Sequence, residues 1–101
     1  MKIEIQSIHF KADQKLLDFI KQKVEKTQTF FEGVQDASVY LRLEKDKEGE
    51  NKIVEIKINL AGSLIFAKEQ DSTFEAATDL VIDKLVAQIK KYKEKLMAKS
   101  A

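Results

Sequence analysis

The 101-residue sequence predicts an α+β fold, a two-layer β-α-β-β-β-α sandwich whose four-stranded mixed sheet carries both helices on one face. Short segments that alternate apolar and polar residues predict strands with one buried face. Two longer segments with apolar residues three and four positions apart predict amphipathic helices. The length fits one domain, and no linker, repeat or low-complexity segment interrupts it. We therefore expect a single domain over residues 1–101.

Four segments have strand periodicity. The first, KIEIQ, loses its phase near Ser7, which indicates a bulge or the strand end. The second and third, ASVYLRLEK and KIVEIKINL, are longer, and the fourth, LIFAKEQ, is short. A polar hairpin loop around Gly49 and a tight turn around Gly62 join the last three strands, which therefore pair antiparallel. The residues expected on the buried face are Ile3, Ile5, Ala37, Val39, Leu41, Leu43, Val54, Ile56, Ile58 and Leu60.

Two segments have helical periodicity. The first begins after Asp13, a good capping residue, and stops at Gly33. It links the first two strands, so a right-handed parallel crossover is expected. Ser72 caps the second helix, which runs from about Thr73 to Met97, and Glu75 completes a capping box. The apolar stripes are Leu16, Ile20, Val24, Thr27 and Phe31 in the first helix, and Phe74, Val81, Leu85, Ile89, Tyr92 and Leu96 in the second.

The composition argues against several classes of protein. There is no cysteine, which excludes disulfides and thiolate chemistry. The start MKIEIQSIHF is no signal peptide, and no segment approaches the ~20 apolar residues of a membrane span, so we expect a cytoplasmic protein with no membrane partner. His9 is the only histidine, the acids lack paired-carboxylate spacing, and EKDKEGEN lacks the calcium-loop pattern. We therefore expect no enzyme, no cofactor and no metal.

Positive charge gathers at one end of the chain. The formal net charge is +1, but residues 84–101 hold six lysines and one acid, whereas residues 1–83 hold twelve basic and sixteen acidic side chains. These segments carry +5 and −4. A solvated helix whose last turn favours lysines explains part of this charge, but not Lys84, three turns earlier. A basic end of this kind attracts an anionic partner.

The lysines of the second helix fall on two flanks of its apolar stripe. At about 100° per residue, Lys84, Lys91 and Lys95 share one flank, and Lys90 and Lys93 lie toward the other. These side chains border the core without entering it. Both flanks are therefore candidates for contacts with an anion.

The first helix places Lys23 and Lys26 away from its deepest core positions, so the lysines of both helices can border a common positive surface. No helix-turn-helix or zinc finger is visible, which argues against DNA. Aromatic residues free for stacking are scarce, because most phenylalanines occupy apolar positions. A phosphate-contacting binder of folded RNA is the best physical interpretation. The alternative is a protein-binding regulatory module that uses a sheet edge or the acidic hairpin EKDKEGEN.

Several motifs resemble the ribosome hibernation promoting factor family, also called the ribosome-associated inhibitor or sigma-54 modulation family. They are VYLRLEK, Glu69 ahead of the second helix, KQKVEKTQTFF and DKLVAQIKKYKEKL. The resemblance spans the chain and is most specific at DKL and QIKKYK. It departs from the family at Phe74, where an Asp-x-Tyr motif is usual, and at Thr27, where a leucine is usual.

The resemblance implies the β-α-β-β-β-α fold and binding to 16S rRNA of the small ribosomal subunit, in the channel used by messenger and transfer RNA. Long members add a C-terminal dimerisation domain; none is expected in this chain, which is similar to the short type. With no heptad seam or large spare apolar surface, a monomer is expected off the ribosome. The rRNA-binding positions that match the family are Lys23, Lys26, Arg42, Lys84, Lys90, Lys91, Lys93 and Lys95.

Overall fold

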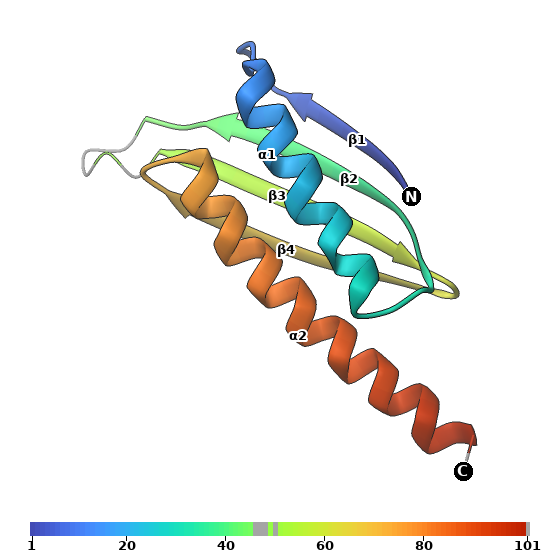
Figure 1. Cartoon of the computed structure of the whole chain (residues 1–101). Coiled ribbons are helices and arrows are strands. Elements are labelled where there is room, and N and C mark those ends of the chain that lie inside the picture. Colours follow the sequence, from blue (N-terminus) through green and yellow to red (C-terminus); the bar gives the residue numbers. More distant parts are fainter. Residues whose placement is uncertain (46–48, 50, 101) are drawn as a thin grey trace.

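The computed structural model describes residues 1–45, 49 and 51–100, and it has the predicted order of elements (Figure 1). The sheet order is β1-β2-β3-β4, with β1 parallel to β2 and the other pairs antiparallel. Both helices lie on one face of this sheet, so the predicted α+β sandwich is confirmed. The elements are β1 Lys2–Ser7, α1 Gln14–Glu25, the 3-10 helix η1 Lys26–Thr29, β2 Val34–Leu43, β3 Lys52–Leu60, β4 Ser63–Asp71 and α2 Phe74–Ser100.

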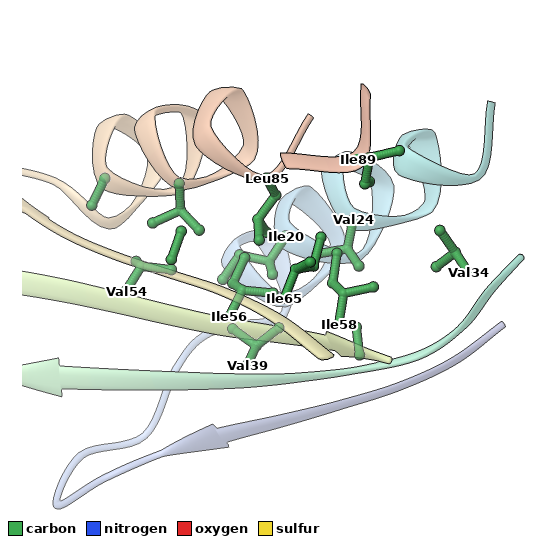
Figure 2. Packing of buried hydrophobic residues seen from close by; sticks show 14 of the residues in the cluster. Ile20, Val24, Val34, Val39, Val54, Ile56, Ile58, Ile65, Leu85 and Ile89 are labelled. Atoms are coloured by element: carbon green, nitrogen blue, oxygen red, sulfur yellow. The ribbon is translucent and has the colours of Figure 1, made fainter. Parts of the chain in front are cut away.

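The core lies between the helices and the inner face of the sheet. Figure 2 shows Leu85 and Ile89 of α2 facing the strands, with Ile20 of α1 beside them. The strand registers align inward positions across the sheet, so that Ile56 of β3 lies between Val39 of β2 and Ala67 of β4. The fully buried side chains include most of those that the alternation predicted: Ile20, Val24, Val39, Leu41, Val54, Ile56, Ile58, Val81, Leu85 and Ile89.

Two residues predicted on the apolar faces are exposed, and five others are only partly buried: Ile3, Ile5, Leu16, Phe31 and Tyr92. Leu43 is 46% exposed at the end of β2, and Leu96 is 41% exposed because α2 continues past the edge of the sheet (Figure 1). Tyr92 packs against the core from its margin, and its hydroxyl donates a hydrogen bond to the Ala61 carbonyl oxygen at 2.7 Å. The periodicity was right for Leu43, Leu96 and Tyr92, but the opposite layer ends before these residues.

The first helix is shorter than predicted. Asp13 caps it as expected, because its Oδ1 accepts a hydrogen bond from the Leu16 amide at 2.8 Å. The α-helix then changes to the 3-10 helix η1 instead of continuing to Gly33. Hydroxyls accompany the change: Thr27 Oγ1 donates to the Val24 carbonyl at 2.6 Å, a local bond of the kind that competes with helical geometry.

The second helix begins one residue later than predicted. Its cap is Thr73, whose Oγ1 accepts from the Ala76 amide at 3.0 Å. Ser72 is not the cap, because its amide and hydroxyl both donate to Asp71 Oδ1. Glu75 therefore stands second in the helix, not third, and the predicted capping box does not form.

The end of β1 and one of the two hairpin turns can be compared with the sequence. β1 ends at Ser7, which accounts for the loss of phase there. The β3–β4 turn contains Gly62 with φ +83°, a left-handed conformation that favours glycine. Half of the predicted hairpin loop EKDKEGEN, residues 46–48 and 50, lies outside the described residues.

Candidate nucleic-acid interface

An open groove of about 690 Å³ lies between the two helices, which run side by side over the sheet (Figure 1). One wall carries Lys23 of α1 with Lys26 and the adjoining Phe30, and the other carries Lys90 of α2. Because positive side chains come from two separate elements, they converge on one concave surface. The α2 side of the groove also contains Asp79, Ile82, Asp83, Val86 and Ala87.

The sequence places these groups by helical spacing. Lys23, Lys26 and Phe30 are separated by three and four residues, which puts them on one side of the first helical segment. Lys90 lies on the flank of α2 away from Lys84, and that flank is the one facing α1. The spacing therefore predicted two flanks of α2, and the packing of the helices determines which of them lines the groove.

The cations of the groove differ in what they contact. Lys23 Nζ lies 3.2 Å from Asp79 Oδ1 and 5.4 Å from the centre of the Phe19 ring. Lys90 Nζ lies 5.5 Å from the centre of the Phe30 ring. In the described part of the chain, Lys26 and Lys90 make no ion pair with an acid. These two ammonium groups are therefore available to an incoming anion.

The side of α2 that carries Lys90 and faces α1 is called the groove flank, and Lys93 continues it toward the C-terminus. Lys93 lines a smaller hollow of about 330 Å³ together with the end of η1 and the loop that follows. Phe30 borders both hollows and is 36% exposed. The groove flank thus presents an accessible ring between two cationic positions, Lys90 and Lys93.

The opposite flank of α2 faces β4 and carries three of the predicted lysines. Lys84 forms an ion pair with Glu69 of β4, and Gln88 Nε2 donates to the Phe66 carbonyl oxygen at 2.8 Å. These contacts hold the helix against the sheet. Lys91 and Lys95 continue the same flank and are exposed. We call this row, Lys84, Lys91 and Lys95, the β4 flank.

Arg42 lies apart from the helix lysines. It alternates with buried Leu41 on β2 and so projects from the face of the sheet away from the helices. Its Nη1 lies 3.2 Å from Glu55 Oε2 on β3. The structure therefore brings Lys23, Lys26 and Lys90 together, adds Lys93 at one end, and separates Arg42 from them by the sheet.

Sequence reasoning overlooked three features of the groove. Phe30 was part of a matching motif, but its position four residues after Lys26 also places it beside the lysines. Asp79 and Asp83 are four residues apart on α2 and both line the groove. Helical spacing applied to the acids as well as to the lysines would have found them.

No membrane-spanning helix is found among the described residues, because none is both long and apolar enough. In the same part of the chain, no three His, Cys, Asp or Glu side chains gather as metal ligands do.

The sequence matches the model of the family described as sigma 54 modulation protein / S30EA ribosomal protein over residues 3–97. The chain belongs to this family. A family relative from Pseudomonas putida, named ribosome hibernation promoting factor, is 28% identical over 95 residues, which covers 94% of this chain and 89% of that protein. A protein of the same name from Klebsiella oxytoca is 28% identical over 96 residues, which covers 95% of this chain and 97% of that protein.

Family members differ in length. A ribosome hibernation promotion factor from Staphylococcus aureus is 26% identical over 100 residues, which covers 99% of this chain but 52% of that protein. Two solved structures have the same fold. A ribosomal subunit interface protein from Coxiella burnetii gives a TM-score of 0.83 at 23% identity, covering 93% of this chain and 99% of that one. The N-terminal domain of Thermus thermophilus Protein Y gives a TM-score of 0.78 at 25% identity, covering 91% of this chain and 99% of that one.

Proposed function

We propose that this protein is a ribosome hibernation factor, which binds the small ribosomal subunit and inhibits translation without catalysing a reaction. Its partner is 16S rRNA in the channel used by messenger and transfer RNA. The observation that carries the proposal is the groove, in which Lys23, Lys26 and Lys90 converge from two helices beside the exposed Phe30. The names of the relatives from Pseudomonas putida and Klebsiella oxytoca point to the ribosome.

The physical basis is the attraction between converging ammonium groups and RNA phosphates. A concave surface brings several cations within reach of one stretch of backbone, and each contact that replaces a condensed counterion strengthens binding at low salt. Lys26 and Lys90 are without acidic partners in the described chain, so binding need not break an existing ion pair at either residue. Folded RNA is recognised mainly by shape and phosphate position, which suits a site with few readable donors and acceptors.

The remaining predicted positions extend this contact. Lys93 continues the groove flank, and Lys84, Lys91 and Lys95 present charge on the other side of α2. Arg42 lies on the outer face of the sheet, so its contact with rRNA would be separate from that of the groove. A protein with this function works in the cytoplasm, and we expect it to be a monomer when it is off the ribosome.

Sedimentation with purified ribosomal subunits tests the proposal. The protein should travel with small subunits and not with large subunits. Messenger and transfer RNA bound beforehand should reduce the amount that sediments, because they occupy the same channel. A protein that stays at the top of the gradient with either subunit would contradict the proposal and favour the protein-binding alternative. If bound messenger and transfer RNA do not reduce sedimentation with small subunits, the protein still binds the small subunit but does not bind in the channel.

A further inference from the structure

Two aromatic rings lie on the face of the sheet that the helices leave uncovered. Phe66 of β4 is 45% exposed, and it alternates with Ile65 and Ala67, which are buried on the helix side. Tyr40 of β2 is half-buried on the same outer face. The sequence-based prediction that stacking rings are scarce missed Phe66 on this face. It failed because β4 carries apolar residues on both of its faces, and only the inner ones are needed by the core.

A lysine lies between the two rings. Lys57 of β3 is the register partner of both Phe66 on β4 and Ser38 on β2. Its Nζ lies 5.7 Å from the centre of the Tyr40 ring, and Arg42 Cζ lies 5.8 Å from the same centre. Strand spacing and rise put Tyr40 and Phe66 roughly 12 Å apart across the sheet. That separation is too large for one base and suits two bases of an extended strand, with Lys57 near the backbone between them.

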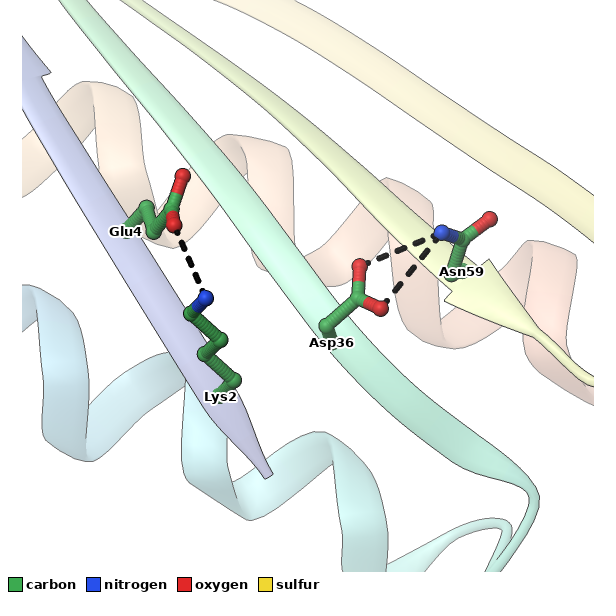
Figure 3. Close-up of polar contacts among 4 residues, drawn as sticks. All are labelled: Lys2, Glu4, Asp36 and Asn59. Atoms are coloured by element: carbon green, nitrogen blue, oxygen red, sulfur yellow. Dashed lines mark hydrogen bonds and ion pairs between the residues drawn. The ribbon is translucent and has the colours of Figure 1, made fainter.

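The acids on this face already have partners. Glu4 pairs with Lys2 at 3.3 Å, and Asp36 accepts a hydrogen bond from Asn59 at 3.2 Å (Figure 3). Glu55 is held by Arg42. In contrast, no ion pair with an acid involves Lys57 or Lys68 within the described residues.

The uncompensated charge therefore lies beside the rings. Lys68 is the register partner of Glu55, one position along β4 from Phe66 on the outer face, so both unpaired lysines adjoin an aromatic side chain. Asp36 is not paired with a cation of the described chain, because Asn59 is neutral, and it lies one outward position from Ser38 on β2. The outer face of the sheet therefore presents lysines and rings over β3 and β4, and it is less favourable to an anion near Asp36.

We infer that the outer face of the sheet is a second RNA surface, which binds a single-stranded segment by stacking unpaired bases on Tyr40 and Phe66 while Lys57 and Lys68 contact its phosphates. The inference goes beyond the proposed function, which uses the groove on the other layer. Rings that alternate with cations are the usual platform for single strands, because every base has a face that can stack. A protein partner fits less well, since lysine is depleted in the centres of protein interfaces.

Fluorescence anisotropy of the full chain with a labelled short oligouridine tests this surface. Phe66→Leu keeps an apolar side chain but removes the ring, and it should weaken binding by about 5- to 150-fold, the range for loss of one stacked base. Lys57→Gln should lower the slope of log affinity against log salt by about 0.7. Asp36→Asn should tighten binding, because it removes a repulsive charge. Circular dichroism checks that each variant is folded.

Leu64→Ala is the matched control, because it removes an exposed apolar side chain from the same face without removing a ring. It should change oligouridine affinity less than Phe66→Leu does. Unchanged affinity of Phe66→Leu, or an equal loss for both variants, would overturn the inference. A Phe66→Leu protein that binds oligouridine normally but loses small-subunit binding would also overturn it and indicate a ribosomal protein on this face. Subunit sedimentation is scored separately, so failure of the proposed function leaves the oligouridine result unaffected.

Discussion

Both flanks of α2 carry lysines but face different surroundings. On the groove flank, Lys90 and Lys93 face α1 and η1 across a concave surface that already contains Lys23 and Lys26. On the β4 flank, Lys84 is paired with Glu69 and the next two lysines follow the exposed side of a single helix. Cations therefore converge on one flank and lie in a row on the other. The presence of lysines alone does not distinguish the two flanks, whereas the packing of neighbouring elements does.

Each flank also has one lysine whose charge is compensated by an acid. Asp79 holds Lys23 at 3.2 Å on the groove side, and Glu69 holds Lys84 on the other. Both pairs are partly exposed, so each contributes at most about 1 kcal/mol to folding. After this pairing, Lys26 and Lys90 remain beside Asp83 in a concave site, and Lys91 and Lys95 remain on a convex one. We expect the concave arrangement to dominate binding to RNA.

The largest effect should come from the core residue that holds both flanks in place. Leu85 is fully buried between them, and Leu85→Ala should lower the free energy of unfolding by about 2–5 kcal/mol, because truncation leaves a cavity. Urea denaturation measures the change. Leu96→Ala is the matched control, since Leu96 is 41% exposed on the same helix and its truncation should cost much less. A loss below about 1 kcal/mol for Leu85→Ala would mean that the flanks are oriented differently.

The next prediction compares the flanks directly. The groove variant has glutamine in place of Lys23, Lys26 and Lys90, which removes three positive charges from the groove. The β4 variant has glutamine in place of Lys84, Lys91 and Lys95, which removes three positive charges from the β4 flank. Affinity for small subunits should fall in both variants and fall further for the groove variant. The slope of log affinity against log salt should shrink by roughly 0.7–0.9 for each phosphate that a lysine no longer neutralises.

Binding at several salt concentrations measures both quantities, and circular dichroism confirms that the variants fold. Surface substitutions of this kind usually change stability by no more than about 0.5 kcal/mol each. Equal losses for the two variants would show that total charge, not the concave geometry, decides affinity. A larger loss for the β4 variant would reverse the comparison and make the row of lysines the main contact.

Strand alternation and helical spacing were sufficient to predict the layers, the order of elements and most of the core. The pattern repeats every two residues in a strand that buries one face, so a shift of register would expose the whole apolar set. Leu43 and Leu96 were placed wrongly because periodicity does not show where the opposite layer ends. The cap of α2 lies one residue later than predicted. Ser72 and Thr73 can both cap a helix, but Ser72 donates its hydrogen bonds to Asp71, so Thr73 is the cap.

The candidate site was less accessible to sequence reasoning. Helical spacing separated Lys90 from Lys84, but it could not show that Lys90 meets Lys23 and Lys26, because that depends on how two helices pack. Arg42 followed from the family resemblance and lies on the other face of the sheet. Contacts between distant elements determine which of these side chains act together, and a single sequence does not report such contacts.

The smallest effect tests whether Glu69 masks Lys84. The Glu69 side chain is 24% exposed and that of Lys84 is 58% exposed, so Glu69→Gln should change the free energy of unfolding by less than about 1 kcal/mol. Affinity for small subunits should rise modestly, because Lys84 then presents an uncompensated charge. The decisive measurement is a double-mutant cycle, in which Lys84→Gln is made in both backgrounds and binding is compared.

If Glu69 masks Lys84, then Lys84→Gln should weaken binding more in the Glu69→Gln background than in the native protein. The corresponding cycle on the groove flank pairs Asp79→Asn with Lys23→Gln and should show the same sign, since that ion pair is also intramolecular. An equal, non-zero cost of Lys84→Gln in both backgrounds would mean that Glu69 does not mask Lys84, whereas no cost in either background would mean that Lys84 serves to attach α2 to β4 and makes no contact with RNA. In that case Lys91 and Lys95 alone would represent the β4 flank in binding, and the asymmetry between the flanks would be greater than the pairing of charges suggests.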